Sequence, residues 1–301
     1  MIIIELMGGL GNQLQQYALY RKFISLGTEA KLDTAWFEAN VQENMKAKRK
    51  LEIDRFEGVT YEVCTPEEKI AVTGGNSFFA KIKRRLDPSS NRFYDESVMY
   101  DETLLGHKDL YLRGYWACEY YYTDIIDELR KQLVLPENPA LVHVAKKIKE
   151  NKSCSIHLRR GDYLEEENQK IFGNICTDAY YDAALDLAVK NGAERFYIFS
   201  EDEEYAESFA EKIKTKFGKE AEYVNVNKGD DSCYDIYLMS LCDINICANS
   251  TFSFWGARLN AHPDKLMIRP TKQKNSQTFD ENEMKKLWKG WTFVDPEGRI
   301  Y

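Results

Sequence analysis

The sequence predicts an α/β protein with parallel, doubly wound sheets, and three observations support this fold class. Short apolar stretches of strand length alternate with helix-like stretches over residues 153–270. Residues 2–33 show the same β-α-β order at the start of the chain. At 301 residues, of which 44% are hydrophobic, the chain is long enough to bury two cores. We therefore expect two domains, 1–150 and 151–301, with the last ~20 residues free to pack back on the N-terminal half.

The first predicted unit begins with a buried strand over residues 2–6, which a glycine-rich turn follows. A helix is predicted over residues 13–26, because its apolar side chains recur on one face and Gly27 comes directly after it. A strand near residues 29–33 completes the β-α-β unit. Residues 34–135 mix charged and aromatic segments without a clear period, so their topology is left open.

The second half has the clearer pattern. Strands are predicted at residues 153–158, 195–200, 222–226, 243–248 and 265–270, with helices between them at residues 177–192, 202–214, 232–241 and 251–260. Helices that separate short apolar strands in this way are typical of a parallel sheet. In such a sheet, ligands bind beyond the carboxyl ends of the strands. The polar segments at residues 157–167, 200–204 and 249–256 follow three of these ends, and we expect them to converge.

Composition and charge exclude several classes of protein. A net charge of -8 argues against a nucleic-acid partner. The start of the chain has no basic region and carries Glu5 inside its apolar run, which argues against a signal peptide or membrane span and for a cytoplasmic protein. Seven cysteines without CxxC spacing and four scattered histidines predict buried thiols and no metal site. The basic run at residues 81–85 is either a solvated face or a weak, peripheral contact with anionic lipid of the inner membrane.

Two adjacent arginines, Arg159 and Arg160, are the sharpest feature of the sequence. Two guanidinium groups at a strand end are costly to bury without an anion, and a diphosphate would satisfy them. Gly161 allows a tight turn there, and Asp162 can hold an arginine or take a proton. The alternative is an internal Arg–Asp ion pair without a ligand, which needs only one of the two arginines.

Two further segments are candidates for donor binding. The segment at residues 249–256 joins a strand to a helix, where hydroxyls and backbone N–H groups form an anion site, although a plain helix start is the alternative. The acidic segment at residues 200–204 could bind ribose or base, but acidic residues also favour any helix start. The full set of donor-binding candidates is Arg159, Arg160, Ser200, Glu201, Asp202, Asn249, Ser250, Thr251, Phe252 and Ser253.

The glycine-rich turn at residues 8–13 is neither a complete dinucleotide fingerprint nor a P-loop, so a structural turn and a ligand loop are equally supported. The missing third glycine argues against a nucleotide-sugar dehydrogenase or epimerase. The aromatic segment at residues 115–122 could stack on sugars, but at this spacing most of it is expected in the core.

Four ordered motifs together resemble the galactoside α-1,2-fucosyltransferase family, glycosyltransferase family 11, in its bacterial branch. They are MGGLGNQLQQYA, HLRRGDY, FSEDEEYA and NSTFSFWGA, and they run through the whole chain. The HxRRxD pattern is shared with α-1,6- and protein O-fucosyltransferases, so it bears more on the donor than on the linkage. Two departures concern the acceptor: Leu14-Gln15 replaces the usual Met-Phe, and Tyr205 stands where tryptophan is frequent.

The resemblance implies a GT-B-like pair of Rossmann-type halves facing a cleft, with an acceptor-side N-terminal domain and a C-terminal domain that binds GDP-L-fucose. It implies inverting transfer of fucose to the 2-hydroxyl of a terminal β-galactoside in an oligosaccharide, without metal or cofactor. A fucosyltransferase of another linkage and a non-catalytic sugar-nucleotide binder remain alternatives.

On this interpretation Arg159 holds the β-phosphate, and Asp162, His157 and Glu167 are the candidate bases in that order. The residues expected near the reacting centre or acceptor are Gly9, Asn12, Gln13, Tyr163, Glu167 and Trp116.

Overall fold

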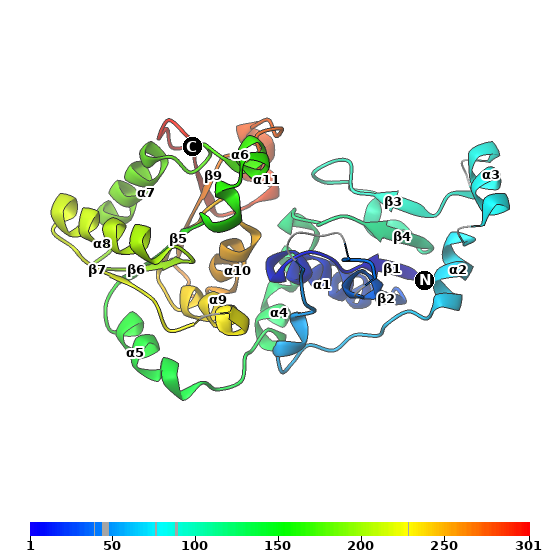
Figure 1. Ribbon diagram of the computed structural model, residues 1–301, viewed down its shortest axis with the longest axis horizontal. Coiled ribbons are helices and arrows are strands. Elements are labelled where there is room, and N and C mark those ends of the chain that lie inside the picture. Colours follow the sequence, from blue (N-terminus) through cyan, green and yellow to red (C-terminus); the bar gives the residue numbers. More distant parts are fainter. Residues whose placement is uncertain (39, 44–47, 76, 88–89, 228) are drawn as a thin grey trace. The chain divides into compact units, whose positions relative to one another are not determined.

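The structure is a computed structural model of residues 1–301. Positions 39, 44–47, 76, 88–89 and 228 lie outside the part that it describes, as do the side chains of residues 80, 162, 164 and 230. The chain divides into two compact units, Met1–Val134 and Leu135–Tyr301 (Figure 1). Each unit is an α/β body built on one parallel sheet, so the predicted pair of Rossmann-type units is confirmed.

The division falls earlier than the boundary expected after residue 150. Helix α5 (Val142–Glu150) packs against α9 (Cys233–Ser240) inside the C-terminal unit. The hydroxyl of Tyr234 on α9 also donates to the carbonyl of Pro136 over 3.1 Å. These contacts join residues 135–150 to the C-terminal unit. Local sequence patterns do not predict contacts of this kind.

The N-terminal unit holds a four-stranded sheet in the order β2-β1-β4-β3 with every neighbouring pair parallel. Its elements are β1 (Ile2–Glu5), α1 (Leu10–Ser25), β2 (Ala30–Asp33), η1 (Ala35–Phe37), η2 (Ile53–Arg55), α2 (Pro66–Thr73), α3 (Phe78–Leu86), β3 (Phe93–Asp95), η4 (Leu104–Gly106), β4 (Leu110–Arg113), η5 (Glu119–Tyr121), η6 (Thr123–Ile125) and α4 (Ile126–Gln132). The predicted opening β-α-β unit is present. Strands β3 and β4 were not anticipated, because each is short and shows no alternation of its own.

The C-terminal unit holds a six-stranded sheet in the order β10-β9-β8-β5-β6-β7, again parallel at every pair. In addition to α5 and α9, its elements are η7 (Pro139–Leu141), β5 (Ser153–Leu158), η8 (Gly161–Leu164), α6 (Glu166–Phe172), α7 (Asp178–Lys190), β6 (Arg195–Ser200), α8 (Glu203–Phe217), β7 (Glu220–Tyr223), η9 (Gly229–Ser232), β8 (Ile244–Ile246), α10 (Thr251–Leu259), β9 (Leu266–Pro270), α11 (Glu281–Leu287) and β10 (Trp291–Val294). The predicted strands and helices of this half are present, with shifted ends.

The strand order shows where this sheet changes direction. From β5 the chain proceeds through β6 to β7, then returns to β8 on the other side of β5 and proceeds through β9 to β10. Because parallel crossovers are right-handed, the helices of the two halves cover opposite faces of the sheet. The even-numbered strand residues Cys154, Ile156 and Ile198 accordingly pack in one core with α7 and α8. The topological switch point lies between β5 and β8.

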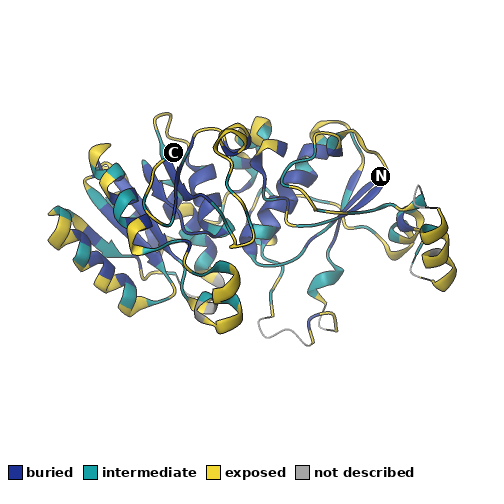
Figure 2. Cartoon of the chain, turned by 90° about the horizontal axis from the view of Figure 1, so that it is seen from above, coloured by how far each residue is buried: buried dark blue, intermediate teal, exposed yellow. Residues whose placement is uncertain are grey.

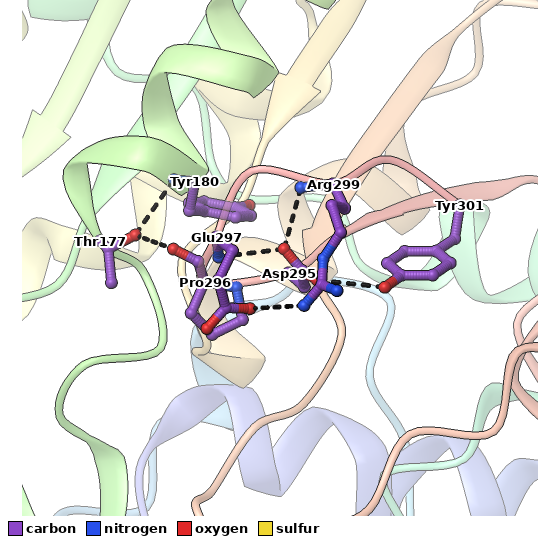
Figure 3. A network of polar contacts seen from close by, with 7 residues as sticks. All are labelled: Thr177, Tyr180, Asp295, Pro296, Glu297, Arg299 and Tyr301. Carbon is purple, nitrogen blue, oxygen red and sulfur yellow. Dashed lines mark hydrogen bonds and ion pairs between the residues drawn. The ribbon is translucent and has the colours of Figure 1, made fainter.

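The end of the chain belongs to the C-terminal unit, where a polar network fixes it to α7 (Figure 3). Asp295 accepts from the backbone N–H of Arg299 at 2.9 Å and from its guanidinium at 2.6 Å. Thr177, the N-cap of α7, donates to the carbonyl of Pro296 at 2.5 Å and accepts from the N–H of Tyr180 at 3.1 Å. The last residues thus complete the sheet of the unit that contains them.

Buried thiols are found as expected, since the structure records seven free cysteines, of which five are buried and two half-buried. Figure 2 shows the buried residues concentrated in the strands of each unit and the exposed residues on the outer helices. Among the helices of the described residues, none combines the length and apolar character needed to cross a membrane.

Candidate functional site

Three neighbouring strands bring the polar segments of the C-terminal unit to one edge. Strand β5 lies between β8 and β6, with Leu158 opposite Ser200 and Ile156 opposite Ile246. The arginines therefore follow the central strand of the three, and the start of α10 and the acidic segment follow its two neighbours. This predicted convergence is confirmed, and it lies at the switch point, where open α/β sheets bind ligands.

Arg160 is held by groups of its own unit. Its Nε donates to Asp202 Oδ2 over 2.8 Å, and its guanidinium lies 4.0 Å from the centre of the Tyr205 ring. Asp202 is also the N-cap of α8, where it accepts from the N–H of Tyr205 at 3.1 Å. These two contacts, the N–H of Tyr205 first and Arg160 second, hold the pKa of Asp202 below its usual value. Arg160 and Asp202 thus fix the loop. The sequence left open an internal Arg–Asp ion pair, and here the aspartate of that pair is Asp202, whereas the sequence suggested Asp162.

Arg159 pairs with a different carboxylate of the acidic segment. Its Nη1 lies 3.3 Å from Glu201 Oε1, and its guanidinium is 5.3 Å from the centre of the Tyr163 ring. The same carboxylate oxygen accepts from the backbone N–H of Arg160 at 3.1 Å. A Cβ on Gly161 would meet that oxygen at 2.5 Å, so the glycine leaves room for Glu201. The ion pair of Arg159 with Glu201 is therefore partly exposed, and a phosphate could compete with this carboxylate for the guanidinium.

The three candidate bases occupy different environments. His157 is 5% exposed, its ring centre lies 5.7 Å from that of Phe252, and its Nδ1 has no hydrogen-bond partner among the described residues. Burial, with Arg159 nearby, lowers the pKa of His157 to about 3. A buried imidazole of such weak basicity does not suit the role of base that the sequence suggested. Asp162 lies in η8 with its side chain outside the described part, and Glu167 is exposed on α6.

Helix α10 begins directly beyond β8, with Ser250 as its N-cap and no acidic residue in its first turn. Ser253 is 1% exposed and donates its hydroxyl to the carbonyl of Ser250 at 3.1 Å, so this side chain points inward. Thr251 and Phe252 are half-buried. The first turn of a helix presents backbone N–H groups and a positive dipole end, which suit an anion. The backbone, rather than the Ser253 hydroxyl, is therefore the group that could bind a phosphate.

Two further donor candidates have structural contacts. Asn249 donates from Nδ2 to the carbonyls of Phe172 and Gln273 at 3.0 and 3.1 Å. Its own carbonyl accepts from the hydroxyl of Tyr163 at 3.3 Å. Ser200 donates to the carbonyl of Leu158 at 3.0 Å. These side chains fix the loops around the site, although the sequence suggested that they bind the donor directly.

Asp235 in the first turn of α9 is a residue that the sequence analysis missed. It accepts from Asn227 Nδ2 at 2.7 Å, and burial raises its pKa to about 7. It lies near Tyr223, whose hydroxyl donates to the carbonyl of Ser200 at 3.1 Å. Burial, then Glu203 and Asp235, raise the pKa of that tyrosine. A carboxyl that titrates so far from its usual range beside a binding edge is a functional candidate. No local signal in SCYDIY distinguishes it.

The glycine-rich turn of the N-terminal unit follows β1. Gly8 has a φ of 81°, and a Cβ there would meet Asn12 Nδ2 at 2.8 Å and Tyr115 Cε1 at 3.4 Å. Gly9 is the N-cap of α1 and accepts from the N–H of Asn12 at 2.9 Å. The conformation of the turn therefore requires glycine at position 8, and the turn packs closely against the segment after β4.

Gln13 has a structural role instead of the one expected near the reacting centre. Its side chain is 0% exposed. The amide donates to the carbonyls of Gly8 and Lys50 at 2.9 and 2.8 Å and accepts from the N–H groups of Glu52 and Ile53 at 2.8 and 3.3 Å. These bonds use both donors and both acceptor positions of the amide. Gln13 thus fixes residues 50–53 to the start of α1.

Trp116 and its neighbour Tyr115 have different environments. Trp116 is 1% exposed, packs against Tyr94 and Tyr121, and has a φ of 53°. Its ring is therefore a core element, which differs from the acceptor contact expected of it. Tyr115 is 47% exposed beside Gly8, and its N–H donates to Glu96 Oε2 at 2.7 Å. The exposed ring of this turn is that of Tyr115, and adjacency in the sequence could not separate the two.

Within the described residues, no group of three or more histidine, cysteine, aspartate or glutamate side chains could hold a metal ion. Among the described side chains, Arg159, Arg160 and the carboxylates that pair with them place charges at the edge of the C-terminal sheet.

Comparisons with known proteins show the family of this chain. A family model described as Glycosyl transferase family 11 matches residues 92–295. An α-1,2-colitosyltransferase of Escherichia coli is 31% identical over 278 residues, which cover 90% of this chain and 91% of that protein. The O-antigen biosynthesis glycosyltransferase WbnK of Escherichia coli is 28% identical over 298 residues, with 89% and 93% covered.

Solved structures with some similarity include POFUT1 in complex with GDP-fucose, at 12% identity, a TM-score of 0.42, and coverage of 89% of this chain and 96% of that one. Another is the Escherichia coli ADP-heptose lps heptosyltransferase II, at 12% identity, a TM-score of 0.40, and coverage of 89% and 84%. At these scores the resemblance says nothing about what this chain binds.

Proposed function

This chain belongs to glycosyl transferase family 11, and from that premise we propose that it transfers L-fucose from GDP-fucose to the 2-hydroxyl of a terminal β-galactoside. The C-terminal unit would bind the donor, and the N-terminal unit would contribute to acceptor binding. The observation that carries the proposal is the switch point of the C-terminal sheet, where Arg159 follows β5 and the start of α10 follows the neighbouring β8.

A diphosphate fits this edge on grounds of charge. The guanidinium of Arg159 presents a planar set of donors, and the first turn of α10 presents backbone N–H groups. As the sugar–oxygen bond breaks, negative charge builds on the β-phosphate, and donors that are already in place stabilise it. We therefore propose that Arg159 supplies the charge that a metal ion supplies in other transferases, and that no metal or cofactor is required.

Asp235 is our candidate for recognition of the base. Strands β5, β6 and β7 are neighbours, and adjacent strands lie about 4.8 Å apart. A nucleoside diphosphate laid along the edge, with its phosphates at Arg159, would bring its base toward Tyr223 and Asp235. Guanine offers N–H donors on its pairing edge, whereas the same edge of adenine or uracil offers fewer, so an anionic carboxylate favours guanine. This assignment moves base recognition from the acidic segment of residues 201–204 to α9.

The reaction would invert the anomeric carbon in a single displacement. The acceptor hydroxyl attacks carbon 1 of fucose from the face opposite the leaving diphosphate, forms the new C–O bond, and gives up its proton as the bond to the β-phosphate breaks. His157 is too weak a base for this proton. We propose that Asp162 takes it, because Asp162 lies in the η8 turn beside Arg159.

Acceptor recognition is assigned to the turn that Gly8 and Tyr115 form. Flat, partly exposed aromatic rings bind the apolar face of sugars well. Tyr115 has such a ring, and Glu96 fixes its backbone.

A second candidate, transfer of colitose, is favoured by the name of the relative that is 31% identical. Colitose is the 3-deoxy analogue of fucose. A site with a polar group that binds the 3-hydroxyl discriminates strongly against the deoxy sugar, whereas a site without one does not. The two donors therefore have to be compared on the same preparation.

The test is incubation of the purified protein with GDP-fucose, with the GDP-linked 3-deoxy sugar, and with UDP-galactose, each with and without lactose. Product linkage is determined by methylation analysis. The proposal expects a 2-linked fucosyl galactoside that forms only with GDP-fucose and acceptor. Faster transfer of the deoxy sugar would favour colitose, comparable rates with UDP-galactose would overturn the donor assignment, and an intact donor in every mixture would make the protein a binder.

A further inference from the structure

Helix α3 (Phe78–Leu86) has a composition unlike the rest of this acidic chain. Its sequence FFAKIKRRL contains four basic residues and no acidic one, in a protein of net charge -8. At about 100° per residue, Phe78, Ile82, Leu86 and Phe79 fall within an arc of about 100° on the helix. The basic residues are therefore segregated from the apolar ones around the axis.

The apolar arc is uncovered. Phe78 is 73% exposed, Phe79 80%, Leu86 80% and Ile82 39%. In Figure 1, α3 projects from the N-terminal unit beyond α2 and the edge strand β3, and Figure 2 shows that most of its residues are exposed. Single exposed apolar residues are ordinary, but four on one face of one short helix form a contiguous patch.

The opposite side of the helix is anchored. Arg84 Nη1 donates to the carbonyls of Thr73 and Gly75 at 2.9 and 2.8 Å, and its guanidinium lies 5.2 Å from the centre of the Phe93 ring. On the helix axis Arg84 lies about 120° or more from every residue of the apolar arc. The anchor fixes the orientation of α3, so the apolar arc points away from the unit instead of folding back onto it.

The remaining basic residues flank the apolar arc. Lys81 and Arg85 lie on one side of it and Lys83 on the other, by the same angular spacing. All three are exposed. A helix with bulky apolar residues on one face and lysine or arginine on both flanks matches the cross-section of a bilayer surface, where acyl chains lie below the headgroup charges.

We propose that α3 is an interfacial anchor that docks this protein on an anionic lipid bilayer, with Phe78, Phe79, Ile82 and Leu86 inserted between the headgroups. Lys81, Lys83 and Arg85 then contact lipid phosphates, while Arg84 keeps the helix attached to α2 and β3. The negative charge of the partner follows from Lys81, Lys83 and Arg85, which a neutral bilayer would not use. This inference does not depend on the sugar that the protein transfers.

The experiment is flotation of the 301-residue chain with vesicles of phosphatidylcholine alone and of phosphatidylcholine mixed with phosphatidylglycerol. Binding is expected to the anionic vesicles only, and to weaken as NaCl is raised. Replacing Lys81, Lys83 and Arg85 together by glutamine should lower the partition coefficient on the order of a hundredfold. Phe79→Ser should lower it about tenfold or more, because a large apolar side chain no longer enters the membrane.

Two matched controls separate the helix from general surface charge and apolarity. The triple variant of Lys146, Lys149 and Lys190 to glutamine removes the same charge from exposed positions of α5 and α7, and Val142→Ser removes an apolar residue that is 66% exposed. Both should bind vesicles like the parent, and all variants should share its melting temperature.

Three results would overturn the proposal: no binding to anionic vesicles, equal binding to neutral ones, or binding that the α3 variants leave unchanged. A fourth is a dimer in sedimentation velocity that Phe79→Ser converts to a monomer without any vesicle binding, which would assign the face to a second copy.

Discussion

Arg160 donates from Nε to Asp202 Oδ2 over 2.8 Å, and this contact separates the roles of two arginines that the sequence presents as equivalent. Arg160 is tied to the N-cap of α8 and to the ring of Tyr205. Its neighbour Arg159 has its Nη1 3.3 Å from Glu201 Oε1. The two arginines pair with different carboxylates, and under the proposed function the two residues should respond differently to substitution.

Arg159→Lys is expected to lower kcat/KM by about a hundredfold or more while the melting temperature changes little. A lysine keeps the charge but not the planar pair of N–H groups. A hydrogen-bond donor that acts on the developing charge stabilises the transition state by roughly 3 kcal/mol. Steady-state kinetics and thermal melting on the same preparation measure both quantities. A destabilised variant that keeps most of its activity would show that Arg159 is structural.

Arg160→Lys is the matched control. It loses the contact with Asp202 and the stacking on Tyr205, so its melting temperature should fall by about 2–4 °C, which corresponds to a loss of about 1 kcal/mol. Its kcat/KM should fall less than that of Arg159→Lys. The opposite order of the two activities would reassign the phosphate contact to Arg160.

Chelation tests the proposal that arginine replaces metal. Turnover is expected to be unchanged in excess EDTA, because in the proposed site a guanidinium and the first turn of α10 would meet the β-phosphate charge. Rates are compared before and after dialysis against the chelator. Loss of turnover that Mg²⁺ or Mn²⁺ restores would show that the transfer needs a divalent ion.

Asp235 predicts a pH dependence of GDP binding. Its pKa is raised to about 7, and only its ionised form can accept two N–H bonds from guanine. The affinity for GDP should therefore rise between pH 6 and pH 8, where this carboxyl loses its proton. In Asp235→Asn the affinity at high pH should be weaker by about tenfold or more, and the rise with pH should be absent. Titration calorimetry at several pH values measures both.

The same carboxyl predicts the sign of a stability change. A folded-state pKa above the unfolded one means that stability falls as pH rises through the folded value, because the folded protein holds a proton that the unfolded chain has released. Asp235→Asn removes this loss, so the melting temperature of the variant should exceed that of the parent most clearly above pH 7. Higher stability without any change in GDP affinity would confine Asp235 to a structural role.

His157 has the opposite shift. The pKa of His157 is about 3 in the folded protein, which is below its value in the unfolded chain. Between these two pKa values the unfolded chain binds a proton and the folded protein does not. The stability of the fold therefore falls as the pH drops through this range. His157→Gln should unfold less readily in acid than the parent, relative to its stability at neutral pH. The profile of kcat/KM between pH 5 and 9 should have the same shape in both proteins. A limb of that profile that vanishes in the variant would identify His157 as the base after all.

Tyr115→Ala is expected to raise the KM for the galactoside about tenfold and to leave the KM for the donor unchanged, since the exposed ring would stack on the acceptor sugar. Tyr120→Ala is the control, because Tyr120 is 44% exposed, close to the 47% of Tyr115, and packs on Tyr100. An equal effect of both substitutions would make the Tyr115 result a consequence of altered packing.

The sequence alone supported much of the architecture and the location of the donor edge. The strands and helices of residues 153–270 were predictable because apolar periodicity is a local property that reports which face of each element is buried. The convergence of Arg159, Glu201 and Ser250 followed from the rule for parallel sheets. Strands β3, β4 and β10 and helix α11 were not predictable, since they are short and take their stability from neighbours distant in the chain.

The sequence by itself determined the α/β class, the family and the edge of the sheet at which the polar segments meet, because these depend on local patterns and on the order of motifs. Only the tertiary structure decided which of the candidate side chains already have partners. Gln13 is saturated by Gly8 and residues 50–53, Trp116 packs against Tyr94 and Tyr121, and burial raises the pKa of Asp235 to about 7. Each of these outcomes depends on contacts between residues far apart in the chain. The free energy of a polar side chain depends on whether it is buried and whether it has a hydrogen-bond partner, and the residue type alone gives neither.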